Sequence, residues 1–196
     1  MLENLKKLDH ELFIFLNGLH HPFWDKIMIT ASDKYFWFPF YALLLAFLVY
    51  QFRKKSYLLL PAIALTIGAA NSISSEIFKP WIARLRPCHD ASLAQVINLV
   101  DGCGGSYGFM SSHAANSFGI AVLMMVTLER KYNWLKLLML TWAAVVSYSR
   151  IYLGAHFPGD VVAGALLGSI SALFFGWLFR KLAARWFPHS PDLQQG

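Results

Sequence analysis

Long stretches without charged residues are the feature of this sequence that most restricts its fold. A helix needs roughly 17–25 mainly apolar residues to cross the hydrocarbon core of a bilayer. The chain is 57% hydrophobic and only 14% charged, and it contains several such stretches. The clearest are Tyr35–Phe52, Tyr57–Ser75, Ser112–Leu128 and Val161–Phe179. A shorter one, Leu135–Ser149, carries Lys136 near its start, where a lysine can extend to the membrane surface. The sequence therefore predicts an all-α, polytopic membrane helical bundle.

The N-terminal part has a different pattern. Residues 3–17 place apolar side chains at helical spacing among charged ones and predict an amphipathic helix, and a shorter helix is expected over 22–32. The pattern leaves open whether this region crosses the membrane or lies on it. A single crossing here would give about six transmembrane helices. We expect one domain over 1–196, with an amphipathic or first-helix region over 1–34, a core bundle over 35–181 and a cytoplasmic tail over 182–196.

Basic residues gather in short connections between the predicted spans and in the tail. The groups are Arg53-Lys54-Lys55, Arg130-Lys131 with Lys136, and Arg180-Lys181 with Arg185. Connections rich in lysine and arginine stay on the cytoplasmic side of a membrane. The net charge of +6 is therefore explained by topology and lipid headgroups, and no nucleic-acid partner is expected. If each predicted span from Tyr35 onward crosses the membrane once, successive connections lie on opposite sides. Residues 79–111 and 150–158 then lie on the extracytoplasmic (periplasmic) face of the inner membrane.

These outer segments keep ionisable groups that topology does not explain. They are the cations Lys79, Arg84, Arg86 and Arg150, together with His89, His113, His156 and Asp160. Ionisable side chains at the mouths of membrane spans are costly and mark functional sites by default. The sequence therefore predicts one site on the outer face, built from segments that are far apart in the chain.

The stretch KPWIARLRP (79–87) directly follows a predicted span. Lys79 supplies a point charge, and Arg86 supplies a planar guanidinium that suits phosphate oxygens. Taken alone, this stretch could also simply anchor a helix end among lipid headgroups.

The stretch FMSSHAANSF (109–118) opens another span. Ser111 or Ser112 is expected to cap the helix, whose free backbone N–H groups form a natural anion site. His113 then lies in the first turn, beside that site. A capped helix with a histidine at the interface is the alternative.

The stretch SRIYLGAHFPGD (149–160) joins the last two spans. Pro158 suits the first position of a helix, so Asp160 falls in the first turn and His156 just before it. A carboxylate beside one imidazole nitrogen fixes the tautomer and leaves the other nitrogen free to attack. The alternative is a capping aspartate and a loop histidine, but Arg150 at the end of the preceding span favours a site.

Together, these stretches resemble the three signature motifs of the type 2 phosphatidic acid phosphatase (PAP2) superfamily. The matching patterns are Lys79-x6-Arg86-Pro87, Ser111-Ser112-His113 and Ser149-Arg150-x5-His156-x3-Asp160. The resemblance extends over roughly residues 79–160, and the surrounding spans match the family's six-helix membrane branch. The second motif is usually Pro-Ser-Gly-His, and here Met110 and Ser112 replace the proline and the glycine. This departure affects the expected loop geometry and substrate shape rather than the reaction.

The resemblance implies phosphate hydrolysis through a phosphohistidine. His156 would attack phosphorus, Asp160 would orient the imidazole ring, and His113 would protonate the leaving oxygen. The phosphate oxygens would be held by Lys79, Arg86, Arg150, Ser111 and the backbone near Ser112. Three cations can offset the charge of a phosphate, and no metal-binding motif is present, so no metal and no other cofactor are expected.

A site at the mouth of a membrane bundle predicts a lipid substrate. The candidates are undecaprenyl diphosphate, phosphatidylglycerol phosphate, phosphatidic acid and the phosphates of lipid A, with a polyprenyl diphosphate or a lipid A phosphate preferred. The main alternative is a transporter or flippase that binds the phosphate without cleaving it. Binding needs only cations, whereas His156 with Asp160 and a second histidine indicates cleavage. A vanadate-dependent oxidase of the same superfamily is disfavoured by the spans.

Cys88 and Cys103 are the only cysteines, and both fall in the predicted outer loop. On an oxidising side of the membrane they could form a disulfide that holds Arg86 near the site, or they could remain two free thiols.

Three further polar residues lie near the first motif. Glu76 is expected to pair with Lys79, three residues later on the same helical face. Arg84 and His89 are expected to be solvated, with contact to a second phosphate or a headgroup as the alternative.

Overall fold

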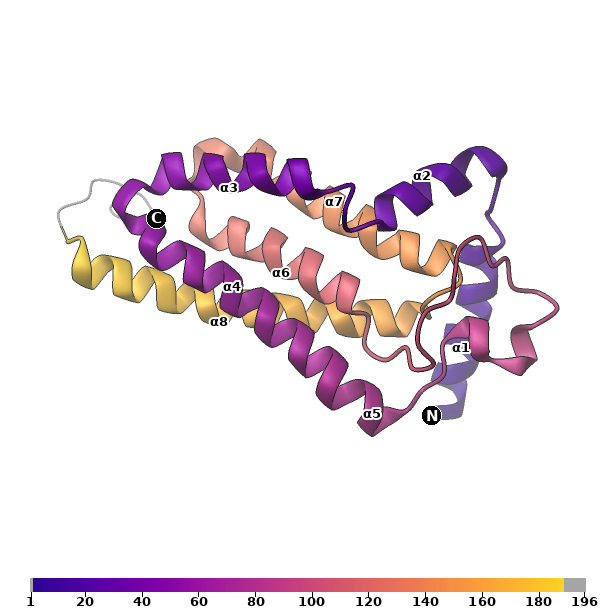
Figure 1. Ribbon diagram of the computed structural model, residues 1–196. Helices are drawn as coiled ribbons and strands as arrows, with labels where there is room; N and C mark the ends of the chain where they lie inside the picture. Colours follow the sequence, from indigo (N-terminus) through magenta and orange to yellow (C-terminus); the bar gives the residue numbers. More distant parts are fainter. Residues whose placement is uncertain (1, 189–196) are drawn as a thin grey trace.

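The computed structural model describes residues 2–188 (Figure 1). Within this range the regular secondary structure is helical, with no named strand. The α-helices are α1 (Leu2–Asn17), α2 (Pro22–Ser32), α3 (Phe38–Phe52), α4 (Ser56–Ser72), α5 (Lys79–Ile82), α6 (Ser112–Thr127), α7 (Asn133–Tyr152) and α8 (Pro158–Trp186). A π-helix, η2 (Ile73–Phe78), continues α4 into α5. The predicted all-α fold class is confirmed for the described residues.

Each predicted apolar span corresponds to one helix, namely α3, α4, α6, α7 or α8, and the two N-terminal helices are also present. The largest difference is at α8, which continues to Trp186 although the apolar run ends at Phe179. The expected start of the cytoplasmic tail at residue 182 stays a prediction, because a helix can continue beyond the membrane boundary. Lysine and arginine are good helix formers and are favourable near a helix C-terminus, so basic residues extend the helix beyond the apolar run. Residues 189–196 of the predicted tail lie outside the described residues.

Two helical stretches of the described chain are long and apolar enough to cross a membrane, Phe38–Ile82 and Pro158–Trp186. The first reverses direction at the turn Arg53–Lys55, so α3 and α4 are the two arms of a helical hairpin (Figure 1). The expected number of about six crossings stays a prediction.

The central helix, α6, packs most closely against α8. Gly164 and Gly168 of α8 face it, and a Cβ on Gly168 would overlap the carbonyl of Ala115. A Cβ on Gly164 would likewise overlap the carbonyl of Ser111, at the start of α6. Small residues allow two helix backbones to approach this closely. The close packing fixes the start of α6 against the start of α8, where the motif residues lie.

Helix α1 crosses one end of the bundle at a steep angle (Figure 1). At its C-terminus the buried side chain of Asn17 donates hydrogen bonds to the carbonyls of Tyr152 (2.8 Å) and Asn98 (3.0 Å). Phe13 is fully buried and packs edge-on against Phe157, with ring centroids 5.3 Å apart. Helix α1 therefore fastens the α5–α6 loop to the α7–α8 turn.

The two ends of the bundle carry different connections. The α3–α4 and α6–α7 turns and the end of α8, which hold the basic groups, lie at one end (Figure 1). The α5–α6 loop and the α7–α8 turn, which hold the motif residues, lie at the other. This separation agrees with the division of charges expected from the sequence.

Candidate active site

The cations of the first and third motifs form one cluster at the end of the bundle that α1 covers. Lys79 begins α5, Arg86 lies in the α5–α6 loop, and Arg150 lies in the last turn of α7. Each of the three is close enough to the other two for their charges to repel. His113 is also close enough to Lys79, Arg150 and His156 for positive charges on these side chains to repel a charge on its ring. The structure therefore brings side chains from all three motifs together.

Lys79 lies where the π-helix η2 meets α5. Its Nζ donates to the hydroxyl of Ser112 (3.0 Å) and lies 3.5 Å from the hydroxyl of Ser75. The Ser112 hydroxyl is also 3.0 Å from those of Ser74 and Ser75. This network of hydroxyls links the first motif to the start of α6. Single turns of π-helix are common at functional sites, and here the turn places two consecutive serines against Ser112.

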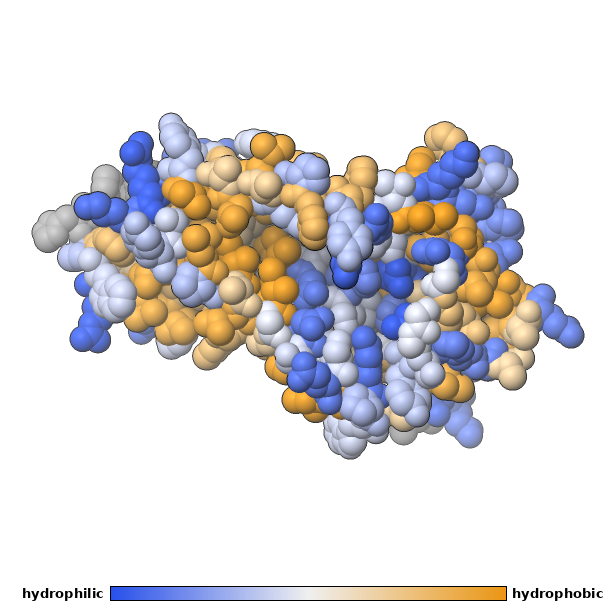
Figure 2. Space-filling model, viewed as in Figure 1, coloured by the Kyte–Doolittle hydropathy of each residue, from blue (hydrophilic) through white to orange (hydrophobic). Residues whose placement is uncertain are grey.

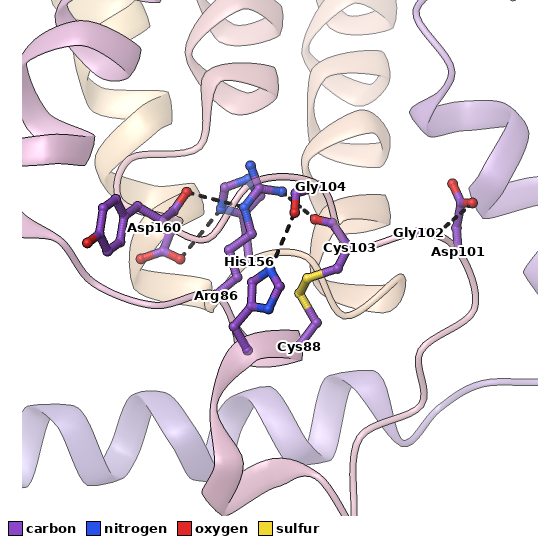
Figure 3. Close-up of a disulfide and its surroundings, with 10 residues drawn as sticks. Arg86, Cys88, Asp101, Gly102, Cys103, Gly104, His156 and Asp160 are labelled. Carbon is purple, nitrogen blue, oxygen red and sulfur yellow. Dashed lines mark hydrogen bonds and ion pairs between the residues drawn. A yellow bond between two sulfur atoms is a disulfide. The ribbon is translucent and has the colours of Figure 1, made fainter.

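Arg86 is held by the backbone of the α5–α6 loop. Its Nη1 donates to the carbonyl of Cys103 (2.9 Å), and its Nε donates to the carbonyl of Tyr107 (3.2 Å). Cys103 is joined to Cys88 by a disulfide, with the two Cα atoms 6.0 Å apart. Figure 3 shows the disulfide on one side of Arg86 and Asp160 on the other, with the ring of His156 overlapping the guanidinium in this view. The covalent link and the carbonyls fix the direction of the arginine side chain.

The start of α6 contributes Ser111 and His113. Ser111 is the N-cap residue, and its hydroxyl accepts from the backbone N–H of Ala114 (3.5 Å). Its own N–H donates to the carbonyl of Asp160 (3.0 Å), which ties α6 to the first turn of α8. His113, in the first turn, is hydrogen-bonded to the backbone of Ser32 at the end of α2. The positive end of the α6 dipole is thereby aimed at the cluster.

Arg150 also reaches the end of α2. Its Nη1 donates to the hydroxyl of Ser32, which is 7% exposed. Its Nε is buried and has no hydrogen-bond partner within the described part of the chain. Ser32 therefore holds both Arg150 and His113. Sequence reasoning missed it, because a serine separated from Arg150 by 118 residues carries no local signal.

His156 and Asp160 form the most deeply buried part of the cluster, at 2% and 0% exposed. The Nδ1 of His156 lies 3.5 Å from Oδ2 of Asp160 (Figure 3). This is long for a hydrogen bond, and Nδ1 has no other partner among the described residues. Catalytic hydrogen bonds are often long before substrate binds. Burial lowers the pKa of His156 to about 4, although the carboxylate of Asp160 acts in the opposite direction, so the ring is neutral at pH 7.

Asp160 is shared between His156 and Arg84. The Nη1 of Arg84 donates to Oδ1 of Asp160 (2.9 Å), and its Nη2 donates to Oδ2 of Asp9 (2.6 Å). The guanidinium also lies 4.1 Å from the centre of the Phe157 ring. The expectation that Arg84 is solvated is therefore wrong. Its side chain is paired with two carboxylates, one of them from the N-terminal helix, and is only 24% exposed.

Asp9 connects α1 to the site in two ways. Besides its ion pair with Arg84, its Oδ1 accepts from the backbone N–H of Gly159 (2.7 Å), in the first turn of α8. Asp9, Arg84, Asp160 and His156 thus form a continuous chain of charged and polar groups. Sequence reasoning placed Asp9 only in an amphipathic helix, because the partners are 75 and 150 residues away.

Gly108 lies at the point where three of the site residues meet. A Cβ at this position would be 2.9 Å from Oδ2 of Asp160, 3.2 Å from Cγ of Arg86 and 3.5 Å from Nδ1 of His156. Any larger side chain would displace at least one of them.

The remaining predicted contacts have mixed outcomes. Lys79 contacts serine hydroxyls instead of Glu76, whose Oε1 accepts from the hydroxyl of Ser72 (3.2 Å). The π-helix η2 changes the register, so residues three apart no longer share a face. His89 is exposed, as expected, and its Nε2 lies 3.3 Å from the carbonyl of Gly104.

One group of residues in the described range has the spacing of metal ligands. The side-chain ligand atoms of Cys88, His89 and Cys103 lie within 4.8 Å of one another. Both sulfurs are bonded to each other in the disulfide, so they are not thiolate ligands in this structure.

Comparison with known proteins places this geometry in a family. The model of the PAP2 superfamily matches residues 58–184. The lipid A 4′-phosphatase of Bacteroides thetaiotaomicron is 42% identical over 188 residues, which cover 94% of this chain and 83% of that protein. The undecaprenyl-diphosphatase of Sulfolobus acidocaldarius is 32% identical over 171 residues, which cover 86% of this chain and 73% of that protein.

A solved structure is also similar to this chain in sequence and in fold. The crystal structure of LpxE from Aquifex aeolicus is 32% identical in sequence and has a TM-score of 0.63. The match covers 86% of this chain and 94% of that one. Because the motif residues converge on one cluster and the family match extends over most of the bundle, we conclude that this chain belongs to the PAP2 superfamily.

Proposed function

We propose that this protein is a membrane phosphatase that removes a phosphate from a lipid through a phosphohistidine intermediate. The observation that carries the proposal is the buried, neutral His156 beside Asp160, within the electrostatic reach of Arg86, Arg150 and His113. A site that only bound phosphate would need the cations but would not need a neutral imidazole oriented by a buried carboxylate.

The chemistry follows from these positions. His156 would use Nε2 to attack phosphorus while the bond to the leaving oxygen breaks, and Asp160 would stabilise the imidazolium that forms. His113, in its protonated form, would give a proton to the leaving oxygen. It would then take a proton from water while the water oxygen attacks phosphorus and the P–N bond breaks, which releases inorganic phosphate. Phosphoryl transfer depends chiefly on positioning and charge stabilisation, which the cations and the start of α6 would supply without a metal.

Two cavities support a lipid substrate. A cavity of about 240 Å³ reaches Ser112 and His113, and an apolar cavity of about 410 Å³ adjoins it between α3, α4 and α6. Figure 2 shows a hollow with hydrophilic residues in it, bordered by hydrophobic residues over the bundle. We therefore assign the lipid tail to the apolar side. The lipid A phosphatase relative makes a lipid A phosphate the first substrate to test, followed by a polyprenyl diphosphate.

We also propose that the site faces the periplasm from the inner membrane. The basic turns lie at the end of the bundle opposite the site, and basic connections stay cytoplasmic. A periplasm-dependent reporter fused after residue 188 should be inactive, and one inserted in the α5–α6 loop should be active. The reverse pattern would place the site on the cytoplasmic side.

A transporter or flippase is the second candidate, because the three cations would bind a lipid phosphate without chemistry. The test is phosphate release from a panel of lipid phosphates by the purified protein in detergent containing EDTA. We expect release that vanadate blocks and that His156→Ala abolishes, whereas His20→Ala, at an exposed histidine in the α1–α2 connection, should retain it. Tight binding without release would support the transporter.

A further inference from the structure

Asn116 is a polar residue of α6 to which the proposed reaction gives no role. It lies one helical turn after His113. Its Oδ1 is buried and has no hydrogen-bond partner in the part of the chain that the structure describes. Buried polar atoms are nearly always paired, so each unpaired one calls for a physical reason.

A second unpaired atom borders the same space. Nε1 of Trp142, on α7, is also buried without a partner among residues 2–188. Trp142 and Asn116 both line the cavity of about 240 Å³ that reaches Ser112 and His113. An indole N–H can only donate, and an amide oxygen can only accept. The cavity beside the phosphate cluster therefore offers one unused donor and one unused acceptor.

Asn116 also lines the apolar cavity of about 410 Å³, whose walls include Leu44, Leu48, Ile63 and Met124. Both cavities share Lys34, Tyr41, Asn116 and Ile120, so they adjoin at this point. The unpaired acceptor thus lies where a polar headgroup would end and an alkyl chain would begin.

We propose that Asn116 and Trp142 determine specificity by binding an amide that joins the phosphate-bearing headgroup to an alkyl chain. The amide N–H would donate to Oδ1 of Asn116, and the amide carbonyl would accept from Nε1 of Trp142. The alkyl chain would then enter the apolar cavity. This inference rests on the proposed phosphatase function and narrows its substrate class to phosphates of N-acylated amino sugars.

The spacing along α6 agrees with such a substrate. Three residues of α-helix correspond to about 4.5 Å, so Asn116 is displaced from His113 by a distance comparable to the width of one sugar ring. An amino sugar can carry a phosphate and an N-acyl group on one ring.

Polyprenyl phosphates and diacylglycerol phosphates have no N–H at this position and would leave the acceptor buried and unpaired. Sites built around a hydrogen bond discriminate strongly against substrates that cannot make it.

The experiment measures kcat/KM for two lipids, an N-acylated glucosamine lipid phosphate and a polyprenyl diphosphate, and takes their ratio. We expect Asn116→Leu to lower this ratio about tenfold, the usual value of one hydrogen bond. Trp142→Phe, which keeps the ring but removes the N–H, should lower it in the same direction. Ile120→Val, at an apolar position lining both cavities, is the matched control and should leave the ratio within about twofold, because it removes no hydrogen bond.

The outcomes separate this inference from the proposed function. If wild type releases phosphate from both lipids and neither polar substitution changes the ratio, the amide site is wrong while the phosphatase stands. If wild type releases phosphate from neither lipid, the proposed function itself fails. Should Asn116→Leu not fold, as judged by its thermal melt, the ratio measured for Trp142→Phe decides the question.

Discussion

At the scale of single residues, Gly108 shows how little space the site leaves. Its position allows no Cβ without a shift of Asp160, Arg86 or His156. The carboxylate of Asp160 cannot move freely, because it already accepts from the backbone N–H of Phe157 (3.0 Å) and from Arg84.

Gly108→Ala should therefore impair catalysis more than folding. A displacement of catalytic groups by about 1 Å can cost roughly 100-fold in rate, and we expect a loss of that order in kcat. Phosphate release measures the rate, and circular dichroism with thermal melting measures the fold. Gly102→Ala, where a Cβ meets no neighbour within 4 Å, is the matched control. Wild-type activity in Gly108→Ala would contradict the close contacts of Gly108 with the site residues.

The protonation of His156 gives a second prediction at this scale. Burial lowers its pKa from 6.5 to about 4, with Arg86 and Arg150 acting in the same direction and Asp160 in the opposite one. In the substrate-free protein the ring should stay neutral at pH 5. Between pH 6.5 and pH 4, His156 binds a proton in the unfolded chain but not in the folded one. The imidazole of His156 therefore makes the folded state less stable as the pH falls from 6.5 toward 4.

NMR of protein labelled with ¹⁵N-histidine can follow this titration. The signal assigned by comparison with His156→Ala should keep the shifts of a neutral ring at pH 5, while free imidazole in the same sample is protonated. A midpoint near 6.5 for that signal would show that the ring is not desolvated as the structure indicates.

At the scale of secondary-structure elements, α1 is part of the site rather than a simple membrane anchor. Asp9 pairs with Arg84 and accepts from the N–H of Gly159, and Arg84 in turn holds Asp160. The family match begins at residue 58, so this contribution comes from a part of the chain outside it.

Asp9→Asn should lower kcat with little change in KM. The substitution removes the charge that helps fix Arg84, and through it the orientation of Asp160, but it leaves the phosphate-binding cations in place. We expect a decrease of about tenfold, as for the loss of one charge-assisted hydrogen bond. Glu11→Gln, on the exposed side of the same helix, should behave like wild type. An increase confined to KM would indicate a role in substrate binding instead.

The disulfide belongs to the α5–α6 loop. It joins two cysteines that are 15 residues apart in the sequence. A cross-link of this length lowers the entropy of the unfolded chain and so stabilises the folded state by about 3 kcal/mol. Cys88→Ser with Cys103→Ser should lower the free energy of unfolding by a similar amount. Maleimide should label the native protein only after reduction. Labelling without a reductant would show two free thiols.

The helices were predictable because each depends on a local property, a long run without charges or a regular apolar spacing. The motif residues were predictable because the family pattern preserves their spacing. Asp9, Ser32 and Gly108 were not, since each acts through neighbours that only the folded chain brings close. The burial of Arg84 was missed for the same reason, as an arginine between two carboxylates looks like any loop cation in the sequence.

At the scale of the whole molecule, the proposed function assigns lipid binding and chemistry on the phosphate to different parts of the fold. The small residues of α8 allow α6 to approach closely, and this contact brings the start of α6 to His156 and Asp160. The hairpin of α3 and α4 provides the apolar side, and α1 and α2 support the polar side. One membrane bundle can thus hold an alkyl chain and a charged headgroup at adjoining sites.

The most direct test of this account is a rapid-quench experiment with a lipid phosphate labelled with ³²P. During a single turnover, we expect a protein-bound phosphate that is stable in base and labile in acid, located on the peptide that contains His156. The label should be absent from His156→Ala. Product formation in the wild type without any such intermediate, or label that persists in His156→Ala, would contradict the assignment of His156 as the nucleophile.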